Sequence, residues 1–297
     1  MQAITTFLQT LVDGILLGGV YAVISTGLSL VFGVMHIINF AHAEFLMIGM
    51  FVAWFAWAYL GIDPMLGAFL ALIVTFVLGL GMQRLLIRPI LGAPQVAQIF
   101  LTVGLLFALE NAALMLFGPE YRSVRTSYQN TAYNLILTGA GDRIIVPSAK
   151  LYAFGMALLS GIALWGLLRH TRFGQAMRAT AQDPMAARLV GINTDRMYMI
   201  AFGLGVGVTA FGGAVILPYI TASPAIGSQY VVLMFTAVVL GGLGSVAGAV
   251  VGGLMVGLIQ SFSALVMPIQ LQNLVLFVVF ILVLALKPEG LTARRRS

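Results

Sequence analysis

The chain has 297 residues, of which 61% are hydrophobic and only 8% are charged. So few charges cannot coat a soluble globule, in which about 25% of residues are charged, and the high hydrophobicity excludes a disordered chain. The formal net charge of +6 comes from arginines in short segments between apolar runs, which is typical of membrane topology signals rather than of nucleic-acid binding. We therefore expect an all-α protein, a polytopic helix bundle in a membrane.

Nine apolar stretches are separated by polar breaks, and most approach or exceed the roughly 20 residues that a helix needs to cross a bilayer. They are 9–35, 37–60, 64–87, 95–117, 149–168, 197–220, 229–241, 246–265 and 269–286. The stretch 229–241 is short for a crossing at about 1.5 Å per residue, and it resembles half of a broken helix. The sequence predicts a single domain over residues 1–297, with eight or nine transmembrane helices and broken or re-entrant segments among them.

Basic residues are distributed unevenly between the two sides that these crossings define. If residues 84–88, the loop 169–196 and the C-terminal tail with Arg294–Arg296 share one side, that side holds 11 of the 15 basic residues. The positive-inside rule then makes 169–196 a cytoplasmic loop. Nine crossings would place the N-terminus outside, but its one charged residue, Asp13, leaves that end undecided.

The chain contains 34 glycines, many at four-residue spacing, such as Gly14 with Gly18 and Gly203 with Gly207. Small residues four apart lie on one helix face and let two backbones approach closely. We expect a tightly packed bundle whose smooth faces can slide.

Sequence signals for catalysis and cofactors are missing. The chain has no cysteine, no phosphate-binding P-loop, and three histidines without metal-ligand spacing. A G-x-G-x-x-A match at 205–210 lies inside an apolar run, which is the wrong context for a dinucleotide site. We expect no catalytic residues, no metal and no cofactor.

Polar residues at membrane depth fall in three places: the segment Asn39–Glu44, the pair Glu110-Asn111, and Asp13. Charged groups in hydrocarbon cost about 2.5–3.5 kcal/mol each on insertion scales, so such groups face a cavity or a partner. Each place has two interpretations. The first is a structural contact, either an interhelical hydrogen bond or a residue at the membrane boundary, and the second is a position along a solute path.

The loop 169–196 contains the signature of a short helix. Asp183-Pro184 is typical of an N-cap followed by proline at the first helical position, and Gly191 is typical of the residue past a helix end. We predict a helix over 184–190, either a plain connector or a rigid plug for a cleft in a soluble partner.

Three separated segments carry a resemblance to one family. The segment NFAHAE (Asn39–Glu44) resembles the N-F-A-H-G-E signature of permease subunits of branched-chain amino acid ABC importers. The segments FTAVVLGGLGSVAGAVVGG (235–253) and Arg172–Arg196 resemble two further segments of that family, and the match is nearest to its shorter, H-type permease.

The resemblance implies half of a permease heterodimer in a bacterial inner membrane, with no enzymatic activity of its own. It implies a second related permease, two cytoplasmic ATP-binding subunits, a periplasmic solute-binding protein and surrounding lipid as partners. We place the translocation path near Asn39, His42, Glu44, Glu110, Asn111, Gly241, Gly242, Gly244 and Ser245. The ATPase-coupling residues implied by the resemblance are Arg178, Asp183, Pro184, Ala186, Ala187 and Gly191.

Three residues depart from the family pattern. Ala43 replaces a glycine, Met185 replaces the glutamate of the short E-A-A-x-x-x-G coupling motif, and Glu110 stands where a neutral amide is expected. The departures at Ala43 and Glu110 leave the solute open among branched-chain amino acids, urea, amides and aromatic acids. Two other functions remain as alternatives to an ATP-driven permease. One is an ion-coupled secondary carrier, which would use Glu44 or Glu110 as its proton site, and the other is a membrane scaffold that moves no solute.

Overall fold

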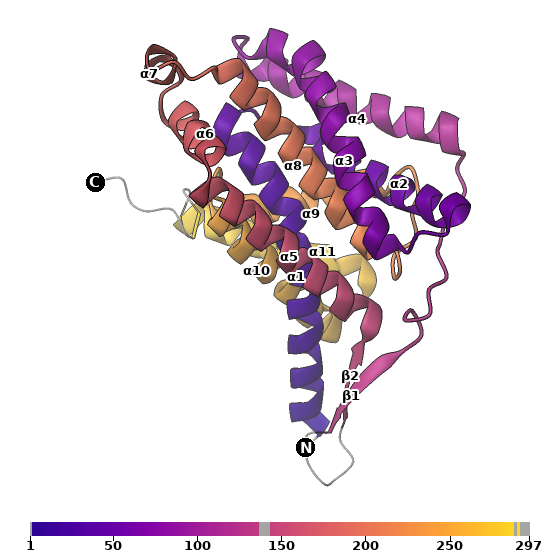
Figure 1. The fold of residues 1–297 in the computed structure, drawn as a ribbon. Coiled ribbons are helices and arrows are strands. Elements are labelled where there is room, and N and C mark those ends of the chain that lie inside the picture. The colour runs from indigo at the N-terminus through magenta and orange to yellow at the C-terminus, as the bar shows by residue number, and fades with distance from the viewer. Residues whose placement is uncertain (1, 137–142, 288–289, 292–297) are drawn as a thin grey trace.

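A computed structural model describes residues 2–136, 143–287 and 290–291, and within them the protein is a helix bundle with one small β-hairpin (Figure 1). The helices are α1 (Gln2–Met35), η1 (Phe40–Ala43), α2 (Glu44–Leu60), α3 (Pro64–Met82), η2 (Gln83–Ile87), η3 (Arg88–Ile90), α4 (Gln95–Phe117), α5 (Ser148–His170), α6 (Arg172–Gln182), α7 (Pro184–Leu189), α8 (Thr194–Ile216), α9 (Ile226–Gly241), α10 (Val246–Val266) and α11 (Ile269–Leu286). The strands are β1 (Ala132–Ile136) and β2 (Arg143–Pro147).

Seven helices of the described chain are long and apolar enough to span a membrane, and two shorter apolar helices, α9 and most of α11, accompany them. Each of the nine apolar stretches in the sequence thus has its own helix. The predicted polytopic all-α bundle is confirmed, including the short helix that ends at Gly241.

The two ends of the bundle differ in chemistry. Arg88 forms an ion pair with Asp195 at 2.5 Å, so residues 84–88 and the loop 169–196 lie at one end, which we call the arginine end. At the opposite end, the hairpin end, the Gln9 side chain bonds the backbone of Ile145 in β2. The N-terminal turns of α1 therefore lie at the end opposite the loop 169–196, as nine crossings require; Arg294–Arg296 lie outside the described residues.

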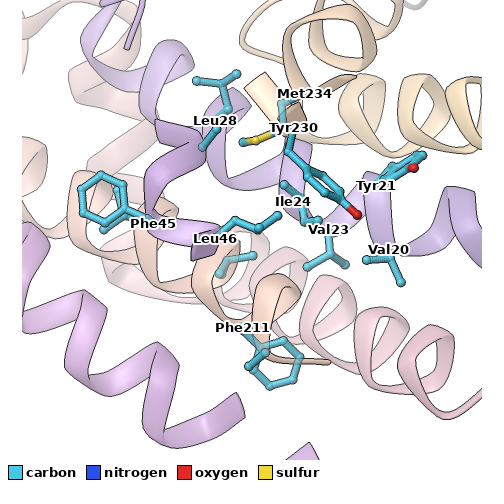
Figure 2. Close-up of a cluster of buried hydrophobic side chains, with 14 of the residues drawn as sticks. Val20, Tyr21, Val23, Ile24, Leu28, Phe45, Leu46, Phe211, Tyr230 and Met234 are labelled. Atoms are coloured by element: carbon cyan, nitrogen blue, oxygen red, sulfur yellow. The ribbon is translucent and has the colours of Figure 1, made fainter. Parts of the chain in front are cut away.

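Small residues set the packing of the bundle, as their spacing predicts. A Cβ added to Gly14 would lie 3.1 Å from Leu258 Cα on α10, and one added to Gly207 would lie 3.1 Å from Leu72 O on α3. The central helices α1 and α8 are the most buried of the long helices, each with 83% of its most apolar window inside the bundle. Figure 2 shows the centre of this core, where side chains of α1 lie beside Leu46 of α2 and Tyr230 of α9.

The structure corrects the sequence prediction in three places. The first helix begins at Gln2 rather than residue 9. The loop 169–196 contains a second helix, α6. Its sequence is mainly polar, so its composition does not distinguish it from a loop. The outer segment 118–148 contains the β1–β2 hairpin, where Ile144 and Val146 are buried and the residue between them is exposed.

Asp13 forms a boundary contact. Its carboxylate accepts from Lys150 Nζ at 3.0 Å and from Gln9 Nε2 at 2.9 Å, next to the hairpin. Of the two interpretations of Asp13, the structure supports the boundary contact.

Candidate functional site: a buried polar cluster and an exposed helix

The chain turns back into the bundle directly after α1. His36, with φ of 57°, ends the helix, and residues 37–39 lead into η1, which packs against α4, α8 and α9. The Thr102 hydroxyl of α4 lies 3.2 Å from the carbonyl of Ile38 and 3.1 Å from the carbonyl of Ile99 in its own helix, so its one hydrogen is shared between the return segment and α4. Asn39, His42 and Glu44 all have 0% exposed surface.

His42 belongs to a hydrogen-bonded chain that joins three elements. Its Nε2 lies 2.8 Å from Thr209 Oγ1 of α8, and the Thr209 hydroxyl donates to the Ile24 carbonyl of α1 at 3.1 Å. Because a hydroxyl has only one hydrogen to donate, His42 must donate through Nε2. The buried Nδ1 of His42 then has a free lone pair and has no hydrogen-bond partner within the described chain.

Asn39 and Glu44 are buried without side-chain partners. Neither amide atom of Asn39 and neither carboxylate oxygen of Glu44 has a hydrogen-bond partner within the described residues. The Glu44 carboxylate packs against Gly227, in the first turn of α9, where an added Cβ would lie 2.5 Å from the carboxyl carbon and from both oxygens. Buried polar atoms of this kind call for an explanation, such as water, a partner or a transported group. We call Asn39, His42, Glu44 and Thr209 the buried polar cluster.

Ala43 fits this segment without strain. Its φ of −68° and ψ of −24° are ordinary helical values, and its methyl group is 1% exposed. A glycine is therefore not required by the backbone at this position.

The two neighbouring residues Glu110 and Asn111 of α4 lie in different surroundings. Glu110 is half-buried and lies within electrostatic range of Glu44. Asn111 is exposed and donates to the Phe107 carbonyl of its own helix at 2.8 Å. Only 17% of the most apolar window of α4 is buried, so this helix presents most of its surface, including the amide, to the outside of the chain.

The glycine turn between α9 and α10 lies elsewhere. Gly242 and Gly244 adopt φ of +104° and +81°, and Ser245 caps α10 by accepting from Gly248 N at 3.0 Å. The 16 residues of α9 separate this turn from Gly227 by about 22 Å at 1.5 Å per residue. The residues predicted to line the path therefore lie in three places: the buried polar cluster, Glu110 and Asn111 on α4, and a turn at the arginine end beside Gly33.

The short helix of the loop 169–196 forms as predicted. In α7 the Asp183 side chain accepts from Met185 N at 2.8 Å and Ala186 N at 3.0 Å, Pro184 is the first residue, and Ala187 faces inward at 3% exposure. Gly191 follows the helix with φ of +86°, a left-handed conformation that favours glycine.

Three large apolar side chains are exposed on α7 and at its C-cap, Val190. Met185, Leu189 and Val190 are 69%, 85% and 76% exposed, although they lie in the most polar segment of the chain. We call these three residues the α7 apolar patch. Exposed apolar groups that gather on one surface mark an interaction site.

Ion pairs and hydrogen bonds connect α6 and α7 to the bundle. Arg188 donates to the Thr194 hydroxyl at 2.7 Å and lies 3.8 Å from Asp195, which also pairs with Arg88. On α6, Arg178 donates to the carbonyl of Leu168 near the end of α5. Arg178 is exposed and lies on α6, where this bond joins α6 to the end of α5.

Sequence reasoning missed Thr209, Gly227 and the α7 apolar patch. A threonine or glycine within an apolar run gives no local sign of which polar group it meets. Met185, Leu189 and Val190 did give a signal, because three large apolar residues within six positions of a polar loop need a surface to cover them.

Comparisons with known proteins concern the sequence as a whole. The family model described as the permease component of branched-chain amino acid transport systems matches residues 10–284. The chain is 32% identical to the high-affinity branched-chain amino acid transport system permease protein BraD of Pseudomonas aeruginosa, over 99% of this chain and 98% of the relative. It is 31% identical to the corresponding protein LivH of Escherichia coli strain K12, over 97% of this chain and 96% of the relative. No solved structure matches the chain significantly.

Proposed function

The chain belongs to the family of permease components of branched-chain amino acid transport systems, and from that premise we propose that it forms half of the membrane path of an ATP-driven importer of branched-chain or related amino acids. The observation that carries the coupling part of this proposal is α7, a capped helix that holds an apolar patch outside the bundle. The chain performs no covalent chemistry in this proposal. It resides in the bacterial inner membrane, with the arginine end in the cytoplasm.

The second, related permease covers α4 in this proposal. Glu110 and Asn111 lie within an apolar helix whose surface is largely uncovered, and lipid contact would be costly for both. A second permease against α4 would replace that contact with a polar path between the two chains. Asn39, His42 and Glu44 would border this path on the inner side of α4, and the turn Gly241–Ser245 would lie at its cytoplasmic mouth.

The two cytoplasmic ATP-binding subunits bind α7 in this proposal. The α7 apolar patch would enter a cleft of one ATP-binding subunit, and the second subunit would bind the partner permease. Motion of that cleft on ATP binding reaches the bundle through Arg188 and Asp195, which link α7 to α8 and to Arg88. A periplasmic solute-binding protein would deliver the amino acid at the hairpin end.

The test is co-purification from the native locus. The tagged chain is solubilised gently, and its stoichiometric partners are identified by mass spectrometry. Recovery of a second polytopic permease and two P-loop ATPases is the expected result. A chain that is recovered alone, under conditions that keep a known importer intact, would overturn the proposal and favour a proton-coupled carrier with Glu44 or Glu110 as its site.

Substitution of the α7 apolar patch sharpens this test. The double variant Leu189→Glu/Val190→Glu should lose the ATPases but retain the second permease, because only α7 is altered. The matched control is Leu85→Glu, which changes another exposed leucine (73%) at the same end but off α7. Equal loss of ATPases in both variants would overturn the assignment of α7.

A further inference from the structure

An apolar groove runs along α1 between α5 and α10. It has a volume of about 340 Å³ and shows almost only apolar atoms. Gly19 and Ala22 of α1 belong to its lining, and Leu158 and Ile162 of α5 (54% and 57% exposed) and Val250 of α10 line it as well. The groove opens on the outer surface of the described chain, where side chains of α5 are exposed, and takes no part in the proposed path.

A basic cavity at the arginine end adjoins the groove. This cavity, about 470 Å³, shares Trp165 and Val246 with the groove and is lined by the two arginines Arg169 and Arg178. The guanidinium of Arg169 lies 5.2 Å from the centre of the Trp165 ring. No aspartate or glutamate belongs to its lining among the described residues. Ser29 also belongs to the lining, and its buried hydroxyl has no hydrogen-bond partner within the described chain.

From the shared wall and the contrast in lining we infer that the groove and the basic cavity together bind one anionic phospholipid. An acyl chain would lie against Leu158, Ile162 and Val250, and the headgroup phosphate would face Arg169 and Arg178, with the Ser29 hydroxyl as a further donor. Basic pockets between helices at the membrane boundary are typical sites for anionic headgroups.

The dimensions and the charge argue for this occupant. Leu158 and Arg169 are 11 positions apart on α5, or about 16 Å, which is close to half of the roughly 30 Å hydrocarbon thickness and so to one leaflet. A transported zwitterion has no long apolar part to fill the groove. A helix of another chain would cover the apolar groove but would leave two arginines without a counter-charge.

Tryptophan quenching by brominated lipids tests the inference. The full chain carries three tryptophans, so a variant with Trp54→Phe and Trp57→Phe leaves Trp165 as the single reporter in the shared wall. It is reconstituted into phosphatidylcholine vesicles that contain a minor fraction of either dibromo-phosphatidylglycerol or dibromo-phosphatidylcholine. We expect stronger quenching by the anionic lipid, and Arg169→Gln should weaken its apparent binding about fivefold, which corresponds to about 1 kcal/mol per basic residue.

Two matched controls distinguish a specific lipid site from general attraction of anionic lipid to the basic surface of the protein. Arg172→Gln removes an exposed arginine of the same segment that does not line the cavity and should leave quenching unchanged. Leu158→Phe narrows the groove and should reduce quenching, whereas Leu159→Phe alters the neighbouring residue, which lines a different cavity, and should not. Equal quenching by both lipids, or equal effects of Arg169→Gln and Arg172→Gln, would overturn the inference.

The assembled importer supplies a second test. The chain has no cysteine, so Ile162→Cys introduces a single reactive thiol in the groove. Retention of phosphatidylglycerol by the purified complex, with no crosslink from this thiol to another subunit, is the expected result. A crosslink to the second permease would overturn the lipid assignment without affecting the proposed transport function.

Discussion

Asp195, in the first turn of α8, lies 2.5 Å from Arg88 beyond the end of α3 and 3.8 Å from Arg188 of α7. All three side chains are about half exposed, and such ion pairs contribute only about 0–1 kcal/mol to stability. Their effect is geometric, because they connect the exposed helix to two membrane-spanning helices.

Asp195→Asn should therefore separate stability from coupling. We expect the melting temperature in detergent to fall by no more than about 3 °C, while solute uptake per assembled complex falls severalfold. Glu120→Gln, which changes an exposed acid at the hairpin end, serves as the control. Unchanged uptake in Asp195→Asn would show that these ion pairs do not transmit motion.

Gly191→Val should disrupt the end of α7 through its backbone. Gly191 has φ of +86° and no atom within 4 Å of an added Cβ, so the strain comes from conformation and not from crowding. A left-handed residue other than glycine costs about 1–2 kcal/mol. We expect transport to be abolished with normal membrane insertion, as measured by uptake and by the amount of protein in the membrane.

Gly191→Asn is the informative companion, because asparagine tolerates the left-handed conformation better than valine. It should retain most of the transport. Gly155→Val, at an open position on α5, should behave like the unmodified protein. Equal loss in the Asn and Val variants would mean that side-chain volume, and not backbone strain, is decisive.

Thr209→Val should destabilise the bundle by breaking the chain His42–Thr209–Ile24. The buried Nε2 hydrogen of His42 would lose its acceptor, which costs about 1–3 kcal/mol. Thr209→Ser keeps the hydroxyl and should lose less. Thermal unfolding of both variants in the same detergent decides the matter, and equal midpoints would argue against a structural role for this hydrogen bond.

Gly227→Ala should be harmful because of Glu44. The added methyl would lie 2.5 Å from the Glu44 carboxylate, so the carboxylate or α9 must move. Overpacking of this kind costs about 1–3 kcal/mol. The double variant Gly227→Ala/Glu44→Ala removes the clash, and we expect it to be more stable than the sum of the single changes predicts.

The double-mutant cycle measures this coupling directly. Residues in contact show interaction energies of about 0.5–3 kcal/mol, whereas independent sites add. Unfolding midpoints of the four proteins give the value. Strict additivity would contradict the packing of Glu44 against the first turn of α9.

The spans and the short helix were predictable because their signals are local. Runs of apolar residues determine where each long helix lies, and Asp183-Pro184 with Gly191 determines the bounds of α7 to within a residue. The β-hairpin was missed because two strands of 5 residues carry too little pattern to stand out within a polar segment.

The partners inside the site were not predictable for a different reason. The membrane environment requires that His42 and Glu44 meet something, but it does not say what. Thr209 is 167 positions from His42, and Gly227 is even further from Glu44, so only the packed structure brings them together.

The length of α1 has a consequence for the membrane itself. Its 34 residues extend about 51 Å, roughly 20 Å more than the hydrocarbon thickness, and Figure 1 shows its first turns reaching past the other helices beside the hairpin. The Asp13–Lys150 pair lies where this overhang begins. A thicker bilayer would draw that charged pair toward the acyl chains, and a thinner one would release it into water. The hairpin end is therefore the part of the protein that is sensitive to membrane thickness. Lipids with longer tails should destabilise the Asp13–Lys150 pair there before they affect the arginine end.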